Sequence, residues 1–438
     1  MKRMRLITSL NSFKLFYLPT ALICVISFSY SQSTDTLKVE TEDCQQEELG
    51  DVLRGMLNKP PKIDTTSKSA SLILLPIIGS NPATGFMVGV GGQFAFQTLG
   101  SELYSLLSGS LQLTTKGQFL ILLKNNIYTK NERIFLSGDW RYQIFSQSTY
   151  GLGTNAPDGG VLDYQYSLAN NETAIDSFAQ PMTFDFLRFH QSVLVKIKPK
   201  FYLGLGYYFD GYYKIVDQKL NLTPDDTLIT SHYAYNTYYD FNTSKYFSSA
   251  ININVLYDSR DNMINSYKGY YARASWRGAF EFLGNEVGGN VYEFEYRSFH
   301  SLSKHNPRHL IAFWMMANFS DEGTFPYMVL PATAYDQRGR SARGYTQGRF
   351  RGNDYVYLET EYRFPITKCN KVLGGVVFAN ATSTNGFEDD PKLFESIKPG
   401  YGAGLRIMVD KQSKTNLAVD FGFGEKSFGF YLAASETF

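Results

Sequence analysis

Short runs in which apolar and polar residues alternate recur from Ser71 to the end of the chain. They are rich in Tyr, Phe, Val, Ile and Gly and are separated by polar or glycine-containing turns. Successive side chains of a β-strand point to opposite faces, so a period of two predicts half-buried strands. We predict sixteen strands, at 71–79, 85–97, 102–113, 117–128, 132–145, 183–197, 200–214, 246–258, 268–281, 290–302, 307–320, 353–364, 371–382, 399–411, 415–425 and 427–438.

Two of these runs show which face is which. Between positions 355 and 363 the odd-numbered residues read Y-Y-E-E-R and the even-numbered ones V-L-T-Y. Between 416 and 423 the even-numbered residues read N-A-D-G and the odd-numbered ones L-V-F-F. One face suits lipid and the other a polar lumen. Because every backbone group in a bilayer must pair internally, such strands can span a membrane only as a closed barrel.

The connections between the runs fall into two classes. Every second one is short, at 98–101, 129–131, 199, 303–306, 365–370 and 412–414, with 259–267 the longest of this class. The others include long segments at 146–182, 215–245 and 321–352. Short turns at one end and long loops at the other are typical of barrels in the bacterial outer membrane. We therefore predict an all-β, 16-stranded antiparallel transmembrane β-barrel over residues 71–438.

The N-terminal residues 1–31 have the charge and apolar pattern of a secretory signal peptide, with cleavage near Ser31. Residues 32–70 form a short periplasmic linker or plug, with a helix-compatible run at 47–57 that Pro60 and Pro61 end. This order predicts the outer membrane of a Gram-negative bacterium as the location. Cys44 and Cys369 remain after cleavage, both on the periplasmic side, and either form a disulfide or stay as free thiols.

Composition and motifs exclude several function classes. The net charge of +1 gives no general reason to bind a polyanion, and aromatic residues make up 16% of the chain. Neither a phosphate-binding loop nor zinc-ligand spacing is present, and the five histidines are scattered. We expect no enzyme activity, no cofactor, no metal, no nucleic acid and no small-molecule substrate. The expected partners are outer-membrane lipid and other outer-membrane or periplasmic proteins.

The stretch 335–353 concentrates positive charge between two predicted strands. Among four glycines it carries five arginines and no acidic residue after Asp336. The arginines are Arg338, Arg340, Arg343, Arg349 and Arg351. A solvated basic loop that binds an acidic surface is one interpretation. The other is a loop that enters a barrel lumen, where at least Arg343 is buried and paired.

A second motif, D-S-R-D-N-M-I-N-S-Y-K-G, follows the eighth predicted strand. Aspartate, asparagine and glycine favour a tight turn, and the charges of its first four residues can cap one another beyond the membrane edge. Its named positions are Asp258, Arg260, Asp261, Asn262 and Gly269. Together with R-G-Y at 343–345, this turn resembles the BamA/TamA family of outer-membrane barrels. The resemblance covers about residues 71–438.

The resemblance implies that the R-G-Y loop folds back into the lumen, with Arg343, Gly344 and Tyr345 at the family's loop positions. The family commonly supplies a wall aspartate as the arginine's partner, but this chain has Asn380 there. A buried guanidinium needs a carboxylate in fork geometry. Glu359 and Asp420 are the first candidates, and Glu361 is a third.

The first and last strands carry the remaining signals. Pro76 interrupts the first strand and removes a ladder donor, which suits an edge. It either bends the strand near a rim or weakens a seam that opens toward lipid. The terminal Phe438, on an amphipathic strand, resembles the signal by which the outer-membrane assembly machinery receives barrel substrates, and Glu436 departs from the ideal signal.

The resemblance implies a barrel that assists insertion, assembly or translocation of proteins, and possibly of lipids, through the inward loop and the seam. The family's POTRA domains have no room in this chain, which implies a POTRA-less member. The alternative is a passive pore or a structural subunit of a larger outer-membrane complex.

Overall fold

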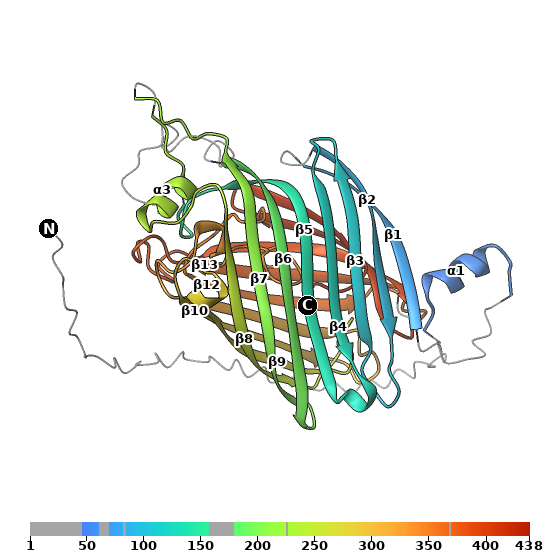
Figure 1. The fold of residues 1–438 in the computed structure, drawn as a ribbon. Coiled ribbons are helices and arrows are strands. Elements are labelled where there is room, and N and C mark those ends of the chain that lie inside the picture. The colour runs from blue at the N-terminus through green and yellow to red at the C-terminus, as the bar shows by residue number, and fades with distance from the viewer. Residues whose placement is uncertain (1–45, 61–69, 82–84, 157–178, 225–226, 368) are drawn as a thin grey trace, which may run out of the picture. The chain divides into compact units, whose positions relative to one another are not determined.

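The computed structural model describes residues 46–60, 70–81, 85–156, 179–224, 227–367 and 369–438. Within them sixteen strands form one antiparallel sheet in chain order, β1 to β16 (Figure 1). The predicted strand number, order and direction are confirmed. The predicted signal peptide and most of the predicted linker lie outside the described residues.

The strands agree closely with the sixteen predicted runs. Their bounds are β1 Ala70–Asn81, β2 Gly85–Phe96, β3 Ser105–Thr114, β4 Phe119–Tyr128, β5 Ile134–Thr149, β6 Gln180–Lys198, β7 Phe201–Asp217 and β8 Tyr246–Asp258. The second half comprises β9 Gly269–Ala279, β10 Gly289–Ser301, β11 Leu310–Ser320, β12 Asp354–Pro365, β13 Leu373–Thr384, β14 Lys398–Asp410, β15 Thr415–Gly424 and β16 Ser427–Ala433.

Side-chain burial follows the predicted alternation. In β12 the side chains of Tyr357, Glu359 and Glu361 are buried, whereas Leu358 is 49% exposed. We call the buried side the inner face and the apolar, exposed side the outer face. Gln93 of β2 donates a hydrogen bond of 3.4 Å to Thr415 of β15, which brings the two ends of the sheet together. An inward polar face and an outward apolar face fit a barrel surrounded by lipid.

The two ends of the sheet differ as predicted. The short connections, such as 199–200 between β6 and β7, lie at one end of the sheet, which we call the turn end. The long loops lie at the other end, which we call the loop end. Helix α3 (Ser231–Tyr238) belongs to the loop between β7 and β8 (Figure 1). No helix in the described residues is long and apolar enough to cross a membrane. The connection between β11 and β12, residues 321–353, is the long loop of the following sections.

The C-terminus departs from the prediction. Strand β16 ends at Ala433, although the pattern predicts a strand to Phe438. Phe428, Phe430 and Leu432 are exposed on the outer face, and continued alternation would place Glu436 there too. A carboxylate facing lipid is costly. The chain instead turns inward, so that the side chains of Glu436 and Phe438 are both buried.

The segment before the barrel is attached at the turn end. Helix α1 (Leu49–Met56) lies within the predicted helical run, and Lys411 between β14 and β15 forms an ion pair of 3.1 Å with Asp51. Glu47 donates its backbone N–H to the Asn370 carbonyl at 2.9 Å. Cys369 is disulfide-bonded. Its predicted partner, Cys44, lies outside the described residues.

Candidate functional site

Arg343 of the long loop meets three carboxylates on the inner face of the sheet. Its Nη2 and Nε donate to the two oxygens of Glu359 at 2.6 and 3.2 Å, which is the fork geometry of a strong charge-assisted pair. Its Nη1 donates to Asp420 at 2.8 Å, and Nη2 also bonds Glu361. Burial alone would lower the pKa of Arg343, but the three carboxylates raise it well above its usual value. The loop is thereby joined to β12 and β15.

These carboxylates belong to a larger network that reaches the C-terminus. Arg363 pairs with Glu361 at 2.6 Å, and Arg406 bridges Asp420 at 2.5 Å and Glu436 at 2.6 Å. Burial alone would raise the pKa of Glu436, but Arg406 and Arg363 outweigh it and lower the pKa to about 2. We call this set the inner-wall network. Its members are Arg343, Arg363, Arg406, Glu359, Glu361, Asp420 and Glu436.

Gly344 and Tyr345 attach the loop to the last three strands. Gly344 has a φ of +107°, and a Cβ there would lie 2.7 Å from the backbone of Phe423 in β15. Its N–H donates to the hydroxyl of Tyr431 at 2.9 Å. The hydroxyl of Tyr345 donates to the Pro399 carbonyl at 2.6 Å. Each residue of R-G-Y therefore has a physical reason for its type at this contact.

Asn380 contacts the backbone of Arg343, whereas the aspartate that the family commonly supplies there would contact the guanidinium. Its amide Nδ2 donates to the backbone carbonyl of Arg343 at 3.0 Å and lies 3.4 Å from Glu359. An amide nitrogen is a donor and cannot accept from a guanidinium. Asn380 therefore holds the loop backbone, while the carboxylates of β12 and β15 hold the charge.

Arg351 and Arg349 are buried near the base of the long loop. Arg351 donates through Nη1 to three carbonyls, those of Tyr327, Met328 and Leu330, at 3.2, 3.0 and 3.0 Å. Within the described residues Arg349 makes a single hydrogen bond, from Nη2 to the Ala156 carbonyl at 2.9 Å. Arg351 thus crosslinks the loop to itself, whereas Arg349 contributes mainly ring contacts.

Arg338 and Arg340 have no carboxylate oxygen at ion-pair distance in the described part of the chain. Arg340 donates to the Leu432 carbonyl at 3.1 Å, and Arg338 donates to the Glu436 carbonyl at 3.4 Å. Burial lowers the pKa of both groups, in contrast to Arg343. Arg343 is therefore neutralised by carboxylates, whereas Arg338 and Arg340, which we call the unneutralised pair, are not.

The turn motif after β8 is buried. Asp258 binds Arg260 through two hydrogen bonds of 2.9 and 2.7 Å and accepts a third, of 2.7 Å, from the Tyr128 hydroxyl of β4. The predicted mutual capping of Asp258 and Arg260 is therefore present. These two residues are only 2% and 5% exposed, so the capping takes place between buried side chains.

The rest of the motif reaches toward the turn between β14 and β15. Asp261 pairs with Lys414 at 2.6 Å, and Asn262 donates to the Ser413 carbonyl at 3.2 Å. Gly269 has a φ of +103° and lies against the Ser259 carbonyl, a conformation that favours glycine. The segment is thus a folded crosslink between two turns, and within it Asn262 accepts from the backbone N–H groups of Ile264 and Asn265. Spacing alone could not reveal the distant partners.

A family model decides the classification. The model described as the Omp85 superfamily domain matches residues 181–438, which is more than half of the chain. The chain belongs to the Omp85 superfamily. Barrels of this superfamily reside in the outer membrane of Gram-negative bacteria, where they mediate insertion or translocation of proteins. The resemblance to BamA/TamA barrels is therefore confirmed at the level of the superfamily.

Three solved structures resemble this Omp85 chain in fold. BamA from Haemophilus ducreyi lacking POTRA domains 1–3 is 13% identical, with a TM-score of 0.48, covering 84% of this chain and 69% of its own. CdiB from Acinetobacter baumannii is 10% identical, with a TM-score of 0.45, and the match covers 82% of this chain and 58% of that CdiB. CdiB from Escherichia coli is 8% identical, with a TM-score of 0.46, and the match covers 84% of this chain and 60% of that CdiB. This chain thus spans less than two thirds of either CdiB. No curated protein matches it.

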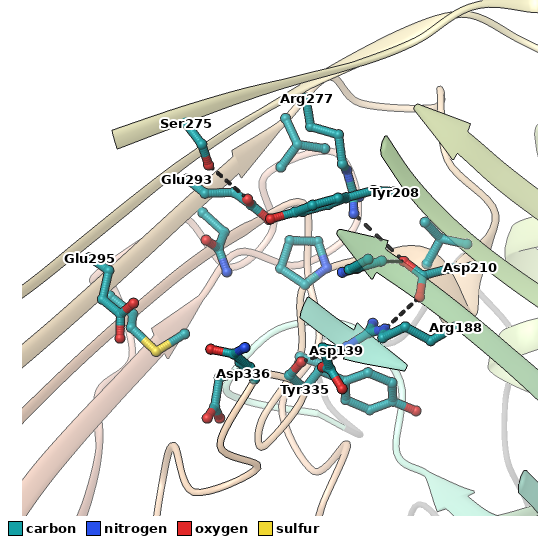
Figure 2. A pocket seen from close by; sticks show the side chains of 18 of the residues that line it. Asp139, Arg188, Tyr208, Asp210, Ser275, Arg277, Glu293, Glu295, Tyr335 and Asp336 are labelled. Carbon is teal, nitrogen blue, oxygen red and sulfur yellow. Dashed lines mark hydrogen bonds and ion pairs between the residues drawn. The ribbon is translucent and has the colours of Figure 1, made fainter. Parts of the chain in front are cut away.

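The Omp85 barrel also contains a polar chamber that the sequence did not single out. Arg188 of β6 pairs with Asp210 of β7 at 2.6 Å, and Asp210 lies 3.7 Å from Arg277 of β9. Figure 2 shows these side chains around the chamber, together with Tyr335 and Asp336 of the long loop, and Arg188 donates to the Tyr335 carbonyl at 3.0 Å. The cavity measures about 160 Å³. The sequence signal that could have indicated this chamber is the charged residues at inward positions of neighbouring strands. Among the described residues no cluster of metal-ligating side chains is present.

The two residues assigned to the seam lie in different surroundings. Pro76 is exposed on the outer face of β1 and pairs in register with Val90 of β2. Phe438 is 2% exposed and packs on Trp314 of β11 with ring centroids 5.3 Å apart. The predicted strand over 427–438 therefore ends early, because the final residues turn into the barrel with Glu436.

The junction of the first and last elements encloses a cavity of about 260 Å³, which we call the seam cavity. It is lined by β1 to β4, by the start of the basic stretch and by the C-terminal residues. The residues used below are Leu75, Pro76, Ile77, Ser108, Lys124, Arg338, Arg340, Leu432, Ala433 and Glu436.

Proposed function

We propose that this Omp85 barrel assists the insertion and assembly of proteins at the outer membrane, or their translocation, through the seam between β1 and β16. The observation that carries the proposal is the seam cavity. It separates β1 from the residues that follow Leu432, so the wall is incompletely packed at the junction. A junction with few contacts opens at lower free energy than the fully paired ladders elsewhere in the sheet.

The inner-wall network gives the seam a fixed frame in this proposal. Arg343 joins the long loop to β12 and β15, and Arg406 joins β14 to Glu436. The last strand is thus held from inside by side chains, while its ladder with β15 extends only from Ser427 to Ala433. We infer that opening moves β1 relative to this frame, and that the reaction involves no covalent chemistry.

Crosslinking the junction tests the proposal. Ile77→Cys and Ala433→Cys place two thiols on the same cavity. A reducible crosslinker between them should block insertion of an unfolded test barrel into liposomes that contain the protein, and reduction should restore it. Each single-cysteine variant, labelled in the same way, is the matched control. The unmodified protein treated with reductant controls for the Cys369 disulfide.

The outcomes separate the two functions. Full insertion activity in the crosslinked protein would refute seam opening. Solute flux through the liposomes without insertion would support the alternative, a passive pore or structural subunit. The long loop and the folded turn after β8 both occupy the interior, which favours a regulated seam over an open channel.

A further inference from the structure

We propose that the seam cavity binds a membrane lipid with an anionic phosphate headgroup, its acyl chains passing out between β1 and β16. This inference names a ligand for the seam and rests on the proposed function only for the opening of the wall.

The inner part of the cavity is cationic. Lys124 of β4 and the loop residues Arg338 and Arg340 line it, and none of them has an ion pair within the described residues. The one carboxylate on the lining, Glu436, is already engaged by Arg406 at 2.6 Å. Three positive charges therefore face a space that holds no free counter-charge.

The two guanidinium groups retain hydrogen-bonding capacity. Each guanidinium carries five N–H donors, and within the described residues each of these two guanidinium groups makes one hydrogen bond, to a backbone carbonyl. Arg338 donates to Glu436 and Arg340 to Leu432. Phosphate oxygens suit the remaining donors, because guanidinium and phosphate form bidentate charge-assisted pairs.

The outer part of the cavity is apolar and reaches the lipid-facing surface. Leu75 and Ile77 line it from the inner face of β1. Pro76 and Leu432 also line it but are exposed on the outer face, Leu432 by 42%. The lining thus runs through the wall from the membrane side to the arginines. A ligand that fits both parts has an anionic end and a hydrocarbon end.

A phospholipid matches this order of surfaces better than a polypeptide strand. A strand that entered the seam between β1 and β16 would need free backbone groups along these edges. The carbonyl of Leu432 in β16 is already bonded to Arg340. A headgroup needs only the cluster of donors, and its chains remain in the bilayer. We therefore assign the site to a lipid and treat a polypeptide as an outcome of the test.

Lipid retention can be measured by native mass spectrometry on the full chain taken from nanodiscs of phosphatidylcholine and phosphatidylglycerol. We expect selective retention of phosphatidylglycerol. Arg338→Gln with Arg340→Gln should weaken it by about tenfold or more, as expected for the loss of charge-assisted hydrogen bonds. Lys130→Gln with Lys304→Gln removes the same charge from exposed turns and should change nothing.

A second variant tests the apolar part. Ser108→Phe places a ring in the cavity from the inner face of β3 and should lower retention of any lipid without changing headgroup preference. Heat-modifiable migration shows that each variant is folded. Equal retention of the two lipids by the unmodified protein would overturn the proposal.

Two further results would also overturn it. Glycerol 3-phosphate binding as tightly as the lipid would reassign the site to a soluble anion. Binding of a peptide with a C-terminal strand sequence, without lipid retention, would reassign it to a polypeptide. No client is present in these assays, so lost insertion activity with retained lipid would count against the proposed function alone.

Discussion

The long loop contains two groups of arginines with opposite surroundings. Arg343 binds three carboxylates, and Arg351 donates through Nη1 to three carbonyls of its own loop. Arg338 and Arg340 lie a few residues earlier and are only partly buried, and their guanidinium groups donate to backbone carbonyls of the last segment. A buried charge that is fully paired holds structure together, whereas a buried charge without a counter-ion is available for a ligand. One basic stretch thus serves two purposes.

Removing Arg343 should have the largest effect. Arg343→Ala leaves Glu359, Glu361 and Asp420 facing one another without their shared cation, which costs about 3–5 kcal/mol for a broken buried pair. We expect faster proteolysis within the long loop and loss of heat-modifiable migration at lower urea.

Arg343→Lys is the matched control, because it keeps the positive charge but loses the fork geometry of the guanidinium. Its stability and its loop protection should lie between those of the unmodified protein and Arg343→Ala. If Arg343→Ala leaves both loop protection and heat-modifiability unchanged, the loop is not held by this residue.

Removing Arg351 should have the second-largest effect on stability. Arg351→Met leaves the carbonyls of Tyr327, Met328 and Leu330 without their shared donor, at about 1–3 kcal/mol. Urea titration of heat-modifiable migration measures it. Arg349→Met is the control, since Arg349 makes one hydrogen bond within the described residues and its loss should cost less. An equal loss in both variants would show that the carbonyl contacts contribute nothing specific.

The third effect depends on pH. The pKa of Glu436 is about 2 in the folded barrel and about 4.3 in an unfolded chain. A lowered pKa stabilises the fold at pH values above the unfolded pKa, and this contribution is lost as the pH falls through the folded pKa. About 1–2 kcal/mol should be lost between pH 6 and pH 3.

The unfolding free energy of the protein minus that of Glu436→Gln isolates this contribution from the other carboxylates. The difference should shrink toward pH 3, and carboxypeptidase should then release Phe438 faster. A difference that stays constant over this range would show that Glu436 is not held as an ion by Arg406.

The smallest effect on stability is expected for the unneutralised pair. Arg338→Gln with Arg340→Gln loses one carbonyl contact each but removes two partly buried charges without counter-ions, so the net change should be within about 1 kcal/mol of zero. Urea titration measures it against Arg343→Ala. A loss comparable to that of Arg343→Ala would remove the distinction between the two groups.

The sequence by itself determined the strands, their number and the direction in which each side chain points. Alternation between Val356 and Arg363 settles which residues face inward, because a strand has a period of two whatever surrounds it. It also showed that Arg343 required a carboxylate and supplied Glu359, Glu361 and Asp420 as candidates, since burying a guanidinium unpaired is costly. That the three share the one guanidinium did not follow from their spacing.

Only the tertiary structure decided which distant residues meet. Asp261 pairs with Lys414, and Glu436 with Arg406, because the curved sheet brings residues far apart in the sequence to one interior surface. The same interior turns Phe438 inward, against the alternation that predicted an outward terminus. Local pattern fixes a side chain's face, while its partner depends on closure of the whole sheet, which no single segment encodes.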